Sequence, residues 1–303
     1  MDVLLKQFLN PAMYNIWMNI VVLSLAGFYL LLTAPKPLLI SWGAPATSGQ
    51  RVSFMIGLCL FYLALGSPVN LIGRQLFSVH MLQQSILYLI MPSFLLLGIP
   101  RQLYRLGFSR IRGAVRAFSS LWSRPLIALV TFNGLFSLYH VPRIFDGIMG
   151  NEWYHALSHG LLILAALMMW WPVMEPLPEQ AVLSPLRKLA YICAAGVLLT
   201  PACALIIFAD HQLFQSYMGE DRLFPVLSVM DDQQMGGVIM KILQEITYGF
   251  TLGHVFFKWV RTERKKEKNM IGNEKGITLK ESGSPQQDWL PSLEGKGSGK
   301  NMG

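Results

Sequence analysis

The sequence predicts an all-α membrane protein with seven transmembrane helices, and three observations support this fold class. The chain has 303 residues and a mean hydropathy of +0.42. Only 14% of the residues are charged, whereas a soluble protein carries roughly 25%. The apolar residues are gathered into long runs, which is typical of spans through a bilayer.

Seven stretches have about the length needed to cross a hydrocarbon core of about 30 Å, which takes roughly 20 residues of helix. In chain order they are residues 16–34, 52–71, 76–97, 125–141, 153–174, 187–209 and 234–258. The first stretch ends in Thr33-Ala34-Pro35-Lys36 without an A-x-A cleavage site, so we expect a retained helix and not a signal peptide. Prolines within or near the span ends are tolerated because neighbouring helices can satisfy the backbone groups that they free.

Basic residues in the short loops predict the orientation, because cytoplasmic loops are enriched in Lys and Arg. One set of loops carries ten such residues and the opposite set carries four. The richer set is Lys36, Arg51, Arg101, Arg105, Arg110, Arg112, Arg116, Arg124, Arg187 and Lys188, and the poorer set is Lys6, Arg74, Arg143 and Arg222. With seven spans, the N-terminus is therefore expected outside and the C-terminus in the cytoplasm.

The composition changes near residue 262, after which the chain is rich in Lys, Glu, Gly and Ser. We expect a seven-helix transmembrane domain over residues 1–261 and a disordered basic cytoplasmic tail over residues 262–303. Much of the net charge of +8 lies in this tail and in one loop, which indicates membrane orientation and not nucleic-acid binding. The three cysteines form no CxxC motif and lie in hydrophobic stretches, so no disulfide framework is expected.

Five of the six histidines are expected near the outer ends of the predicted spans. They are His80, His140, His155, His159 and His211, and they come from four different spans. All five fall within about two helical turns of the outer boundary, so one layer could hold them together. Imidazole suits copper, zinc and iron, and imidazoles that converge at one depth are what a metal site needs.

The spacing of His155 and His159 places both side chains on one face of a helix, one turn apart, where two imidazoles could reach the same ion. The residues between them include no Glu, so the HExxH pattern of a zinc protease lacks its general base. The alternative is that these histidines lie at the headgroup level and bond to water or to neighbouring helices.

Polar residues also mark the last predicted span. The carboxylate of Asp232, which precedes Gln233, is favoured near a helix N-terminus by the helix dipole, or it could orient a ligating histidine from behind. Gly236 and Gly237 would allow close helix packing. Deeper in the span, Lys241 and Glu245 are four residues apart and are expected to neutralise each other as a structural pair.

Several short motifs follow one another in a specific order along the chain. They are His80-Met81-Leu82-Gln83-Gln84, Gly98-Ile99-Pro100, Tyr139-His140-Val141-Pro142, the segment from His155 to His159, Trp170-Trp171-Pro172-Val173, and Asp232-Gln233-Gln234-Met235-Gly236-Gly237. In these motifs, over roughly residues 50–260, the chain resembles the seven-helix CtaG-type assembly factors of caa(3)-type cytochrome c oxidase. An unrelated copper protein with one membrane anchor and a soluble domain shares that name, and its mechanism does not apply here.

The resemblance implies a role in making active haem-copper oxidase, through the copper centre buried in subunit I. The matching family positions are the histidines His80, His140, His155 and His159 and the acidic-Gln pair Asp232 and Gln233. Broader relatives often carry a second histidine four residues after the first, where this chain has Gln84, a poor metal ligand.

Our leading hypothesis is a non-enzymatic metallochaperone in the bacterial plasma membrane. The expected metal ligands are His80, His140, His155, His159 and His211, with Asp232, Gln233 and Gln84 orienting them from behind. The family resemblance implies copper as the cargo. We expect it as Cu(I), because thioether sulfur favours this oxidation state and methionines such as Met81 and Met149 are expected on or near the same side. The expected partners are the catalytic subunit of cytochrome c oxidase, an extracytoplasmic copper donor protein and the lipid bilayer, but no nucleic acid.

Three rival hypotheses remain. A copper transporter would need ligands through the bilayer, but only Cys59, Cys193, Lys241, Glu245 and His254 lie below the outer layer. A metal-free scaffold for oxidase subunits predicts that alanine at the histidines leaves oxidase activity intact. A haem-modifying membrane enzyme is disfavoured, because no second layer of histidines occurs at the depth of buried haem ligands.

Overall fold

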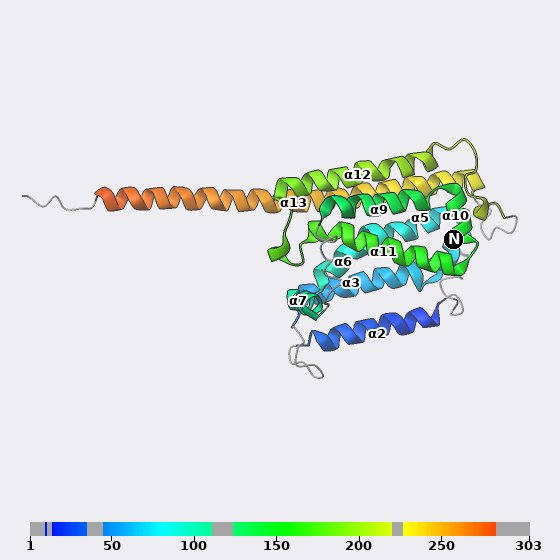
Figure 1. Cartoon of the computed structure of the whole chain (residues 1–303), viewed down its shortest axis with the longest axis horizontal. Coiled ribbons are helices and arrows are strands. Elements are labelled where there is room, and N and C mark those ends of the chain that lie inside the picture. The colour runs from blue at the N-terminus through cyan, green and yellow to red at the C-terminus, as the bar shows by residue number, and fades with distance from the viewer. Residues whose placement is uncertain (1–9, 11–13, 35–44, 111–123, 220–226, 283–303) are drawn as a thin grey trace, which may run out of the picture. The chain divides into compact units, whose positions relative to one another are not determined.

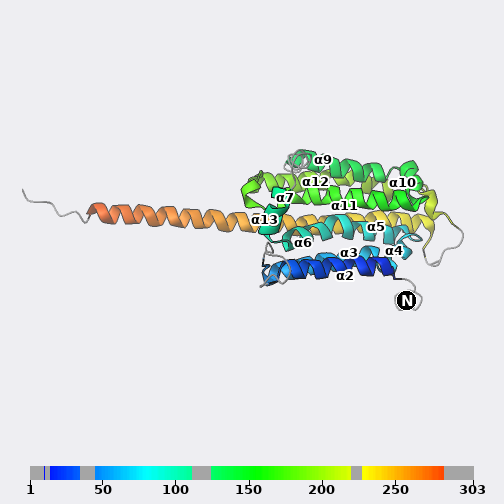
Figure 2. The same ribbon diagram turned by 60° about the horizontal axis from the view of Figure 1, so that its bottom comes forward.

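The computed structural model describes residues 10, 14–34, 45–110, 124–219 and 227–282. Within these ranges the chain is helical and contains no strand, as the predicted all-α class requires. The helices are α2 Ile16–Leu32, α3 Ser48–Leu65, α4 Pro68–Gly73, α5 Phe77–Ser85, the π-helix η2 Ile86–Ile90, α6 Met91–Gly98, α7 Arg101–Arg110, α9 Pro125–Tyr139, α10 Pro142–Met149, α11 Glu152–Met174, η3 Pro178–Gln180, α12 Pro185–Ile207, η4 Gln215–Tyr217 and α13 Val229–Ser282. The longer helices run alongside one another (Figures 1 and 2).

Several of these helices can cross a membrane. Four helical stretches are long and apolar enough, namely α3, the continuous run Phe77–Gly98, α11 and α12. The pair α9 and α10, which is bent by 77° where the two helices meet, would add a fifth, broken span. The protein is therefore a membrane protein with four or five such spans among its described residues.

Each of the seven ranges predicted to span the membrane contains helix. The first, α2, has 17 residues and is shorter than the helices that qualify as spans. The last lies within the first part of α13, which carries the ion pair of Lys241 and Glu245 at 2.6 Å. The count of seven crossings and the placement of the two termini on opposite sides remain predictions.

The described connections between the long helices up to residue 256 lie at two ends of these helices. At one end, which we call the histidine end, lie the segments 66–76, 140–151 and 208–219, which contain the short helices α4, α10 and η4. The Arg74 guanidinium pairs there with Glu152 at 2.8 Å, and the Asp146 carboxylate accepts the backbone N–H of Ser216 at 2.9 Å. At the opposite end, Arg105 pairs with Glu179 at 2.6 Å.

Close packing at the histidine end depends on a glycine in α13. A Cβ atom built on Gly236 would lie 2.5 Å from Cδ1 of Phe77 and 3.0 Å from Cγ of Met81. A side chain at position 236 would therefore push α13 away from α5. This contact is the close helix approach that the Gly-Gly pair predicted.

The structure differs from the expected disorder at the start of the tail. The chain divides into two units, residues 1–256 and 257–303. Residues 262–282, which we expected to be disordered, continue α13 as helix. Lys and Glu are good helix formers, Lys266 pairs with Glu263 at 3.0 Å, and the first proline of this segment is Pro285. The rest of the predicted tail, residues 283–303, lies outside the described residues.

Candidate functional site

The first part of the site is a row of polar side chains on α5 and η2. His80, Gln84 and Tyr88 are spaced by four residues, so they follow one another along one face of this helical run. Nε2 of His80 lies 2.9 Å from Nε2 of Gln84 and 3.1 Å from the hydroxyl of Tyr139 on α9. All four side chains are buried. The row therefore brings α5 and α9 together through one imidazole.

The second part comes from α11, which begins at Glu152 behind a polar cap. Oδ1 of Asn151 accepts the backbone N–H of Trp153 at 2.9 Å, which fixes the start of the helix close to its two histidines. Nε2 of His155 lies 3.2 Å from Nε2 of His159, and the two ring centroids are 4.5 Å apart. The predicted one-turn spacing thus brings the two Nε2 atoms together, with the planes of the two rings nearly perpendicular at 88°.

These two parts form one cluster of three imidazoles. The centroid of the His80 ring is 6.1 Å from that of His155 and 6.2 Å from that of His159. The exposed fractions of the three residues are 1%, 7% and 4%. Side chains from two helical runs more than seventy residues apart in the sequence therefore meet in a buried region at the histidine end.

Tyr88 holds the far side of the His159 ring, with its hydroxyl 2.5 Å from Nδ1. The local backbone explains how Tyr88 is held. Pro92 has no N–H to bond the carbonyl of Tyr88 four residues earlier, and the indole N–H of Trp170 donates to that carbonyl at 3.1 Å. The π-helix η2 begins two residues before Tyr88, and such bulges occur often at functional sites.

His140 lies one layer away from the three clustered imidazoles. The rings of Tyr139 and Phe145 each contact both His80 and His140. Nδ1 of His140 lies 2.7 Å from the carbonyl oxygen of Phe136. A carbonyl only accepts, so Nδ1 carries the proton and Nε2 has a free lone pair. That Nε2 is buried and has no hydrogen-bond partner in the part of the chain that the structure describes.

His211 is not part of this cluster. It lies in the loop after α12, its side chain is 73% exposed, and Nδ1 is 2.5 Å from the carboxylate of Asp210. This contact lowers the pKa of the Asp210 carboxyl. Among the ring contacts of the described residues, none joins His211 to the other four histidines. The predicted depth of His211 was therefore not enough to bring it to the site.

Asp232 reaches across from α13 to the start of α5. Its carboxylate accepts the backbone N–H of Phe77 at 2.8 Å and the N–H and hydroxyl of Ser78 at 3.2 and 2.5 Å. The first N–H groups of a helix have no partner within that helix, and the N-cap residue of α5, Leu76, supplies none. Asp232 thus caps a neighbouring helix and fixes the turn that leads to His80.

The next residue, Gln233, holds the loop that follows α12. Its Oε1 accepts the backbone N–H of Leu213 at 2.8 Å, and its Nε2 donates to the carbonyl of His211 at 3.4 Å. Of the three predicted orienting side chains, Gln84 contacts a histidine ring directly, at Nε2 of His80. The described side-chain hydrogen bonds of Asp232 and Gln233 go to Phe77 and Ser78 at the start of α5 and to the loop after α12.

Sequence reasoning missed the tyrosines Tyr88 and Tyr139. The signal for Tyr88 was its spacing, because it lies four residues after Gln84 and eight after His80. Tyr139 directly precedes His140 in a motif that we had read for its histidine alone. Both phenols are buried and bond to imidazole, which agrees with the rule that buried hydroxyl groups find partners.

The cluster is held by hydrogen bonds and does not form a ready-made cage for a metal ion. Within the described residues, no three side chains of His, Cys, Asp or Glu are placed to hold an ion. The pair of His155 and His159 comes nearest, since nitrogen atoms sharing a tetrahedral ion at about 2.0–2.1 Å lie roughly 3.3 Å apart. Their Nε2 atoms are 3.2 Å apart. The described residues therefore supply at most two imidazole ligands for such an ion, at a separation that the hydrogen bond between them also explains.

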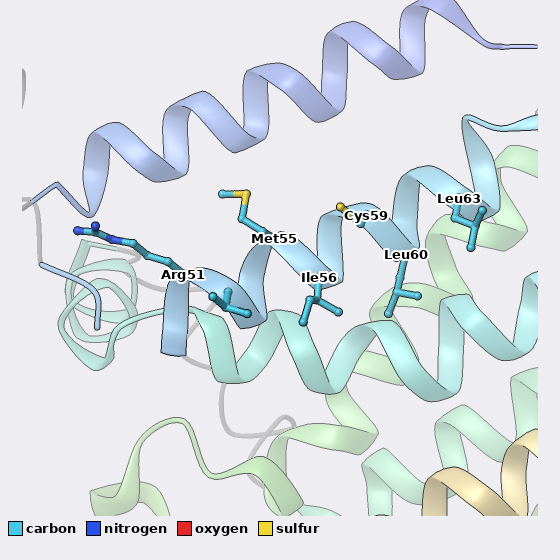
Figure 3. Close-up of a pocket in the computed structure, with 7 residues that line it drawn as sticks. Arg51, Met55, Ile56, Cys59, Leu60 and Leu63 are labelled. Atoms are coloured by element: carbon cyan, nitrogen blue, oxygen red, sulfur yellow. The ribbon is translucent and has the colours of Figure 1, made fainter. Parts of the chain in front are cut away.

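A separate cavity of about 420 Å³ lies along α3, away from the histidines. Arg51 and Leu63 mark its two ends, and the residues between them are largely apolar (Figure 3). The groove lies on a helix that is long and apolar enough to cross a membrane. It adds no residue to the histidine cluster.

The sequence matches the family model described as cytochrome c oxidase caa3 assembly factor (Caa3_CtaG) over residues 27–262. It is also similar to the uncharacterized proteins Mb0105 of Mycobacterium bovis and MT0111 of Mycobacterium tuberculosis, each 23% identical over 238 residues. The uncharacterized protein ML1998 of Mycobacterium leprae is 21% identical over 240 residues. These alignments cover 72% of this chain but 35% of each relative, so the chain spans about a third of their length. No solved structure matches the chain.

Proposed function

This chain belongs to the family of cytochrome c oxidase caa3 assembly factors, and we propose that it hands copper to the catalytic subunit of such an oxidase. In this proposal the cargo is Cu(I), the destination is the copper centre of subunit I, and the role is non-catalytic. The protein acts in the bacterial plasma membrane, with the histidine end on the extracytoplasmic side. An extracytoplasmic donor protein supplies the copper.

The observation that carries the proposal is the facing pair of His155 and His159. Their Nε2 atoms are 3.2 Å apart and both residues are buried. If both Nε2 atoms bind copper, the Nδ1 proton of His159 is directed at the Tyr88 hydroxyl. A hydrogen bond from the second ring nitrogen is the usual support of a ligating histidine.

Two further imidazoles extend the candidate ligand set. His80 lies about one ring away from the pair, and His140 presents a buried Nε2 lone pair that no described residue uses. An unused buried lone pair is costly unless something binds it. If copper moves between imidazoles by ligand exchange, it can bind the Nε2 lone pair of His140, which no described hydrogen bond satisfies.

The test is the double variant His155→Ala plus His159→Ala, expressed in cells whose caa3 oxidase can be isolated. We expect normal amounts of the variant, and oxidase that contains haem but lacks the copper of subunit I. The matched control is Tyr154→Ala plus Ser158→Ala, which changes residues with the same spacing on the same helix. Oxidase with full copper and full activity in the histidine variant would refute copper handling by this pair.

A metal-free scaffold is the second candidate, because the cluster is already linked by hydrogen bonds. His80, Gln84 and Tyr139 form one linked group, and Tyr88, His159 and His155 form another. Such networks can fix how helices pack without any metal. In this case the histidine variant would lower the amount of assembled oxidase, and the oxidase that remained would have its normal copper content.

A further inference from the structure

Gln84 contacts Nε2 of His80, one of the two ring nitrogens through which an imidazole can bind a metal. Nε2 of Gln84 lies 2.9 Å from Nε2 of His80, and the Tyr139 hydroxyl lies 3.1 Å from the same ring nitrogen. Both neighbours are buried, with Gln84 at 0% exposure. Nε2 of His80 therefore has two hydrogen-bonding neighbours outside the α11 pair, whereas the Nε2 atoms of His155 and His159 have each other as partners at 3.2 Å.

The orientation of the Gln84 amide does not change this conclusion. With the amide NH2 toward His80, the amide donates to the Nε2 lone pair. With the amide oxygen toward His80, Nε2 must carry a proton in order to donate. In both arrangements the ring nitrogen is unavailable to a metal ion until the contact with Gln84 breaks.

The other end of the Gln84 amide is unsatisfied. Its Oε1 is buried and has no hydrogen-bond partner among the residues that the structure describes. A buried acceptor without a partner raises the free energy of the arrangement. Packing therefore holds Gln84 against His80 although the unsatisfied Oε1 atom raises the free energy of this arrangement. A competing ligand for His80 can break the contact.

We propose that Gln84 withholds His80 from copper, so that Cu(I) rests on His155 and His159 and gains His80 as a third ligand only when Gln84 releases it. The proposal rests on the proposed copper function. When the exchange occurs, the hydrogen bond between the Gln84 amide and Nε2 breaks and a bond from Nε2 to copper forms. With the amide NH2 toward His80, no proton leaves either residue. With the amide oxygen toward His80, the proton on Nε2 moves to Nδ1 before Nε2 binds copper. Copper keeps its oxidation state in both cases.

This arrangement explains how one site can both keep and release its cargo. Two imidazoles give a site of lower affinity than three, and a transfer protein must not bind its metal too tightly. Gln84 keeps the resting site at two ligands although a third imidazole lies about 6 Å away, between ring centroids. It therefore sets the affinity without touching the metal, as a positioning residue.

The test measures Cu(I) affinity of the purified full chain in detergent, by anaerobic competition with a coloured Cu(I) chelator. The proteins are the wild type, His80→Ala, Gln84→Leu, the double variant of these two, and His155→Ala plus His159→Ala. We expect His80→Ala to leave the affinity unchanged. We expect Gln84→Leu to raise it on the order of tenfold, within the range by which residues behind metal ligands act, and the double variant to lose that gain.

X-ray absorption at the copper edge supplies a readout that a change in packing alone would not move. The wild type should show two nitrogen ligands, and Gln84→Leu should show three. The matched control is Gln244→Leu, which also removes a fully buried amide, one that bonds to the carbonyl of Gly196 on α12. This control should keep the affinity and the ligand number of the wild type, and thermal melting in detergent shows whether each variant is folded.

The outcomes separate the proposal from its premise. If His80→Ala weakens copper binding as strongly as the His155→Ala plus His159→Ala variant, His80 is already a ligand and the proposal fails, while the copper function stands. An unchanged affinity in a folded Gln84→Leu protein also overturns the proposal. If neither the wild type nor Gln84→Leu binds Cu(I), the copper function fails and the proposal fails with it.

Discussion

Replacing Asp232 by alanine should loosen the start of α5 from α13. The carboxylate accepts two backbone N–H groups and one hydroxyl from Phe77 and Ser78, and all these groups are buried. A hydrogen bond to a charged group contributes about 1.5–3 kcal/mol. Because the three bonds share one carboxylate and do not add fully, we expect the unfolding free energy to fall by about 3 to 4 kcal/mol.

Asp232→Asn should lose less, because an amide keeps one oxygen that can accept a backbone N–H. Asp231→Ala is the matched control, since Asp231 is the preceding residue and its described hydrogen bonds go to Ser228 within its own helix turn. Reversible unfolding in mixed detergent micelles measures the free energy. Hydrogen exchange over residues 74–82 should show faster exchange at the first amides of α5 in Asp232→Ala.

The reasoning about this cap has a clear refutation. If Asp232→Ala and Asp231→Ala unfold at the same denaturant concentration and exchange alike over α5, the bonds across the two helices do not stabilise the site. If Asp232→Ala is destabilised but Cu(I) binding is unchanged, the cap supports the fold and not the position of His80.

Three other substitutions have expected outcomes. Tyr88→Phe removes a buried hydroxyl from the neighbouring imidazole and should cost about 1–3 kcal/mol in unfolding free energy, measured in the same micelles. Gly236→Ala places a Cβ 2.5 Å from a phenylalanine ring of α5 and should cost about 1–3 kcal/mol, whereas Gly249→Ala, with no described atom within 4 Å of its Cβ, should not destabilise. Arg74→Gln breaks an ion pair in which the partner, Glu152, is 83% exposed, so thermal melting should change by no more than the roughly 1 kcal/mol typical of surface pairs. A larger loss in Gly249→Ala than in Gly236→Ala would contradict the packing of α13 on α5.

The helices could be predicted from the sequence because an apolar run that spans a bilayer must satisfy its backbone hydrogen bonds internally, and a helix does so within one segment. Their ends were less certain. The break after Tyr139 agrees with Pro142, which begins α10. The 77° bend could not be read from the sequence, and Phe145 of the bent helix is fully buried against Phe77 and Phe214. Residues 262–282, which we predicted to be disordered, are rich in Lys and Glu, and both residues are good helix formers.

The site could be predicted only as far as depth and helical face. The spacing of His155 and His159 gave their contact correctly, because that contact is local to one helix. His80 and His211 had similar predicted depth, but depth does not specify whether a residue points into the bundle or into a surface loop. The roles of Tyr88 and Asp232 depend on contacts between distant segments, and a single sequence contains no direct signal for those.

The hydrogen bonds of the cluster bear on the choice between scaffold and copper handling. A network built only for packing would be expected to satisfy every buried polar atom, since an unsatisfied group in a low-dielectric interior is costly. Five buried side-chain atoms of the described residues have no partner, and two of them, Nε2 of His140 and Oε1 of Gln84, belong to the residues of the histidine site. One is a lone pair suited to a metal, and the other belongs to the side chain that occupies His80. Defects at these two positions, next to a facing imidazole pair, favour a site that exchanges ligands over one that only joins helices.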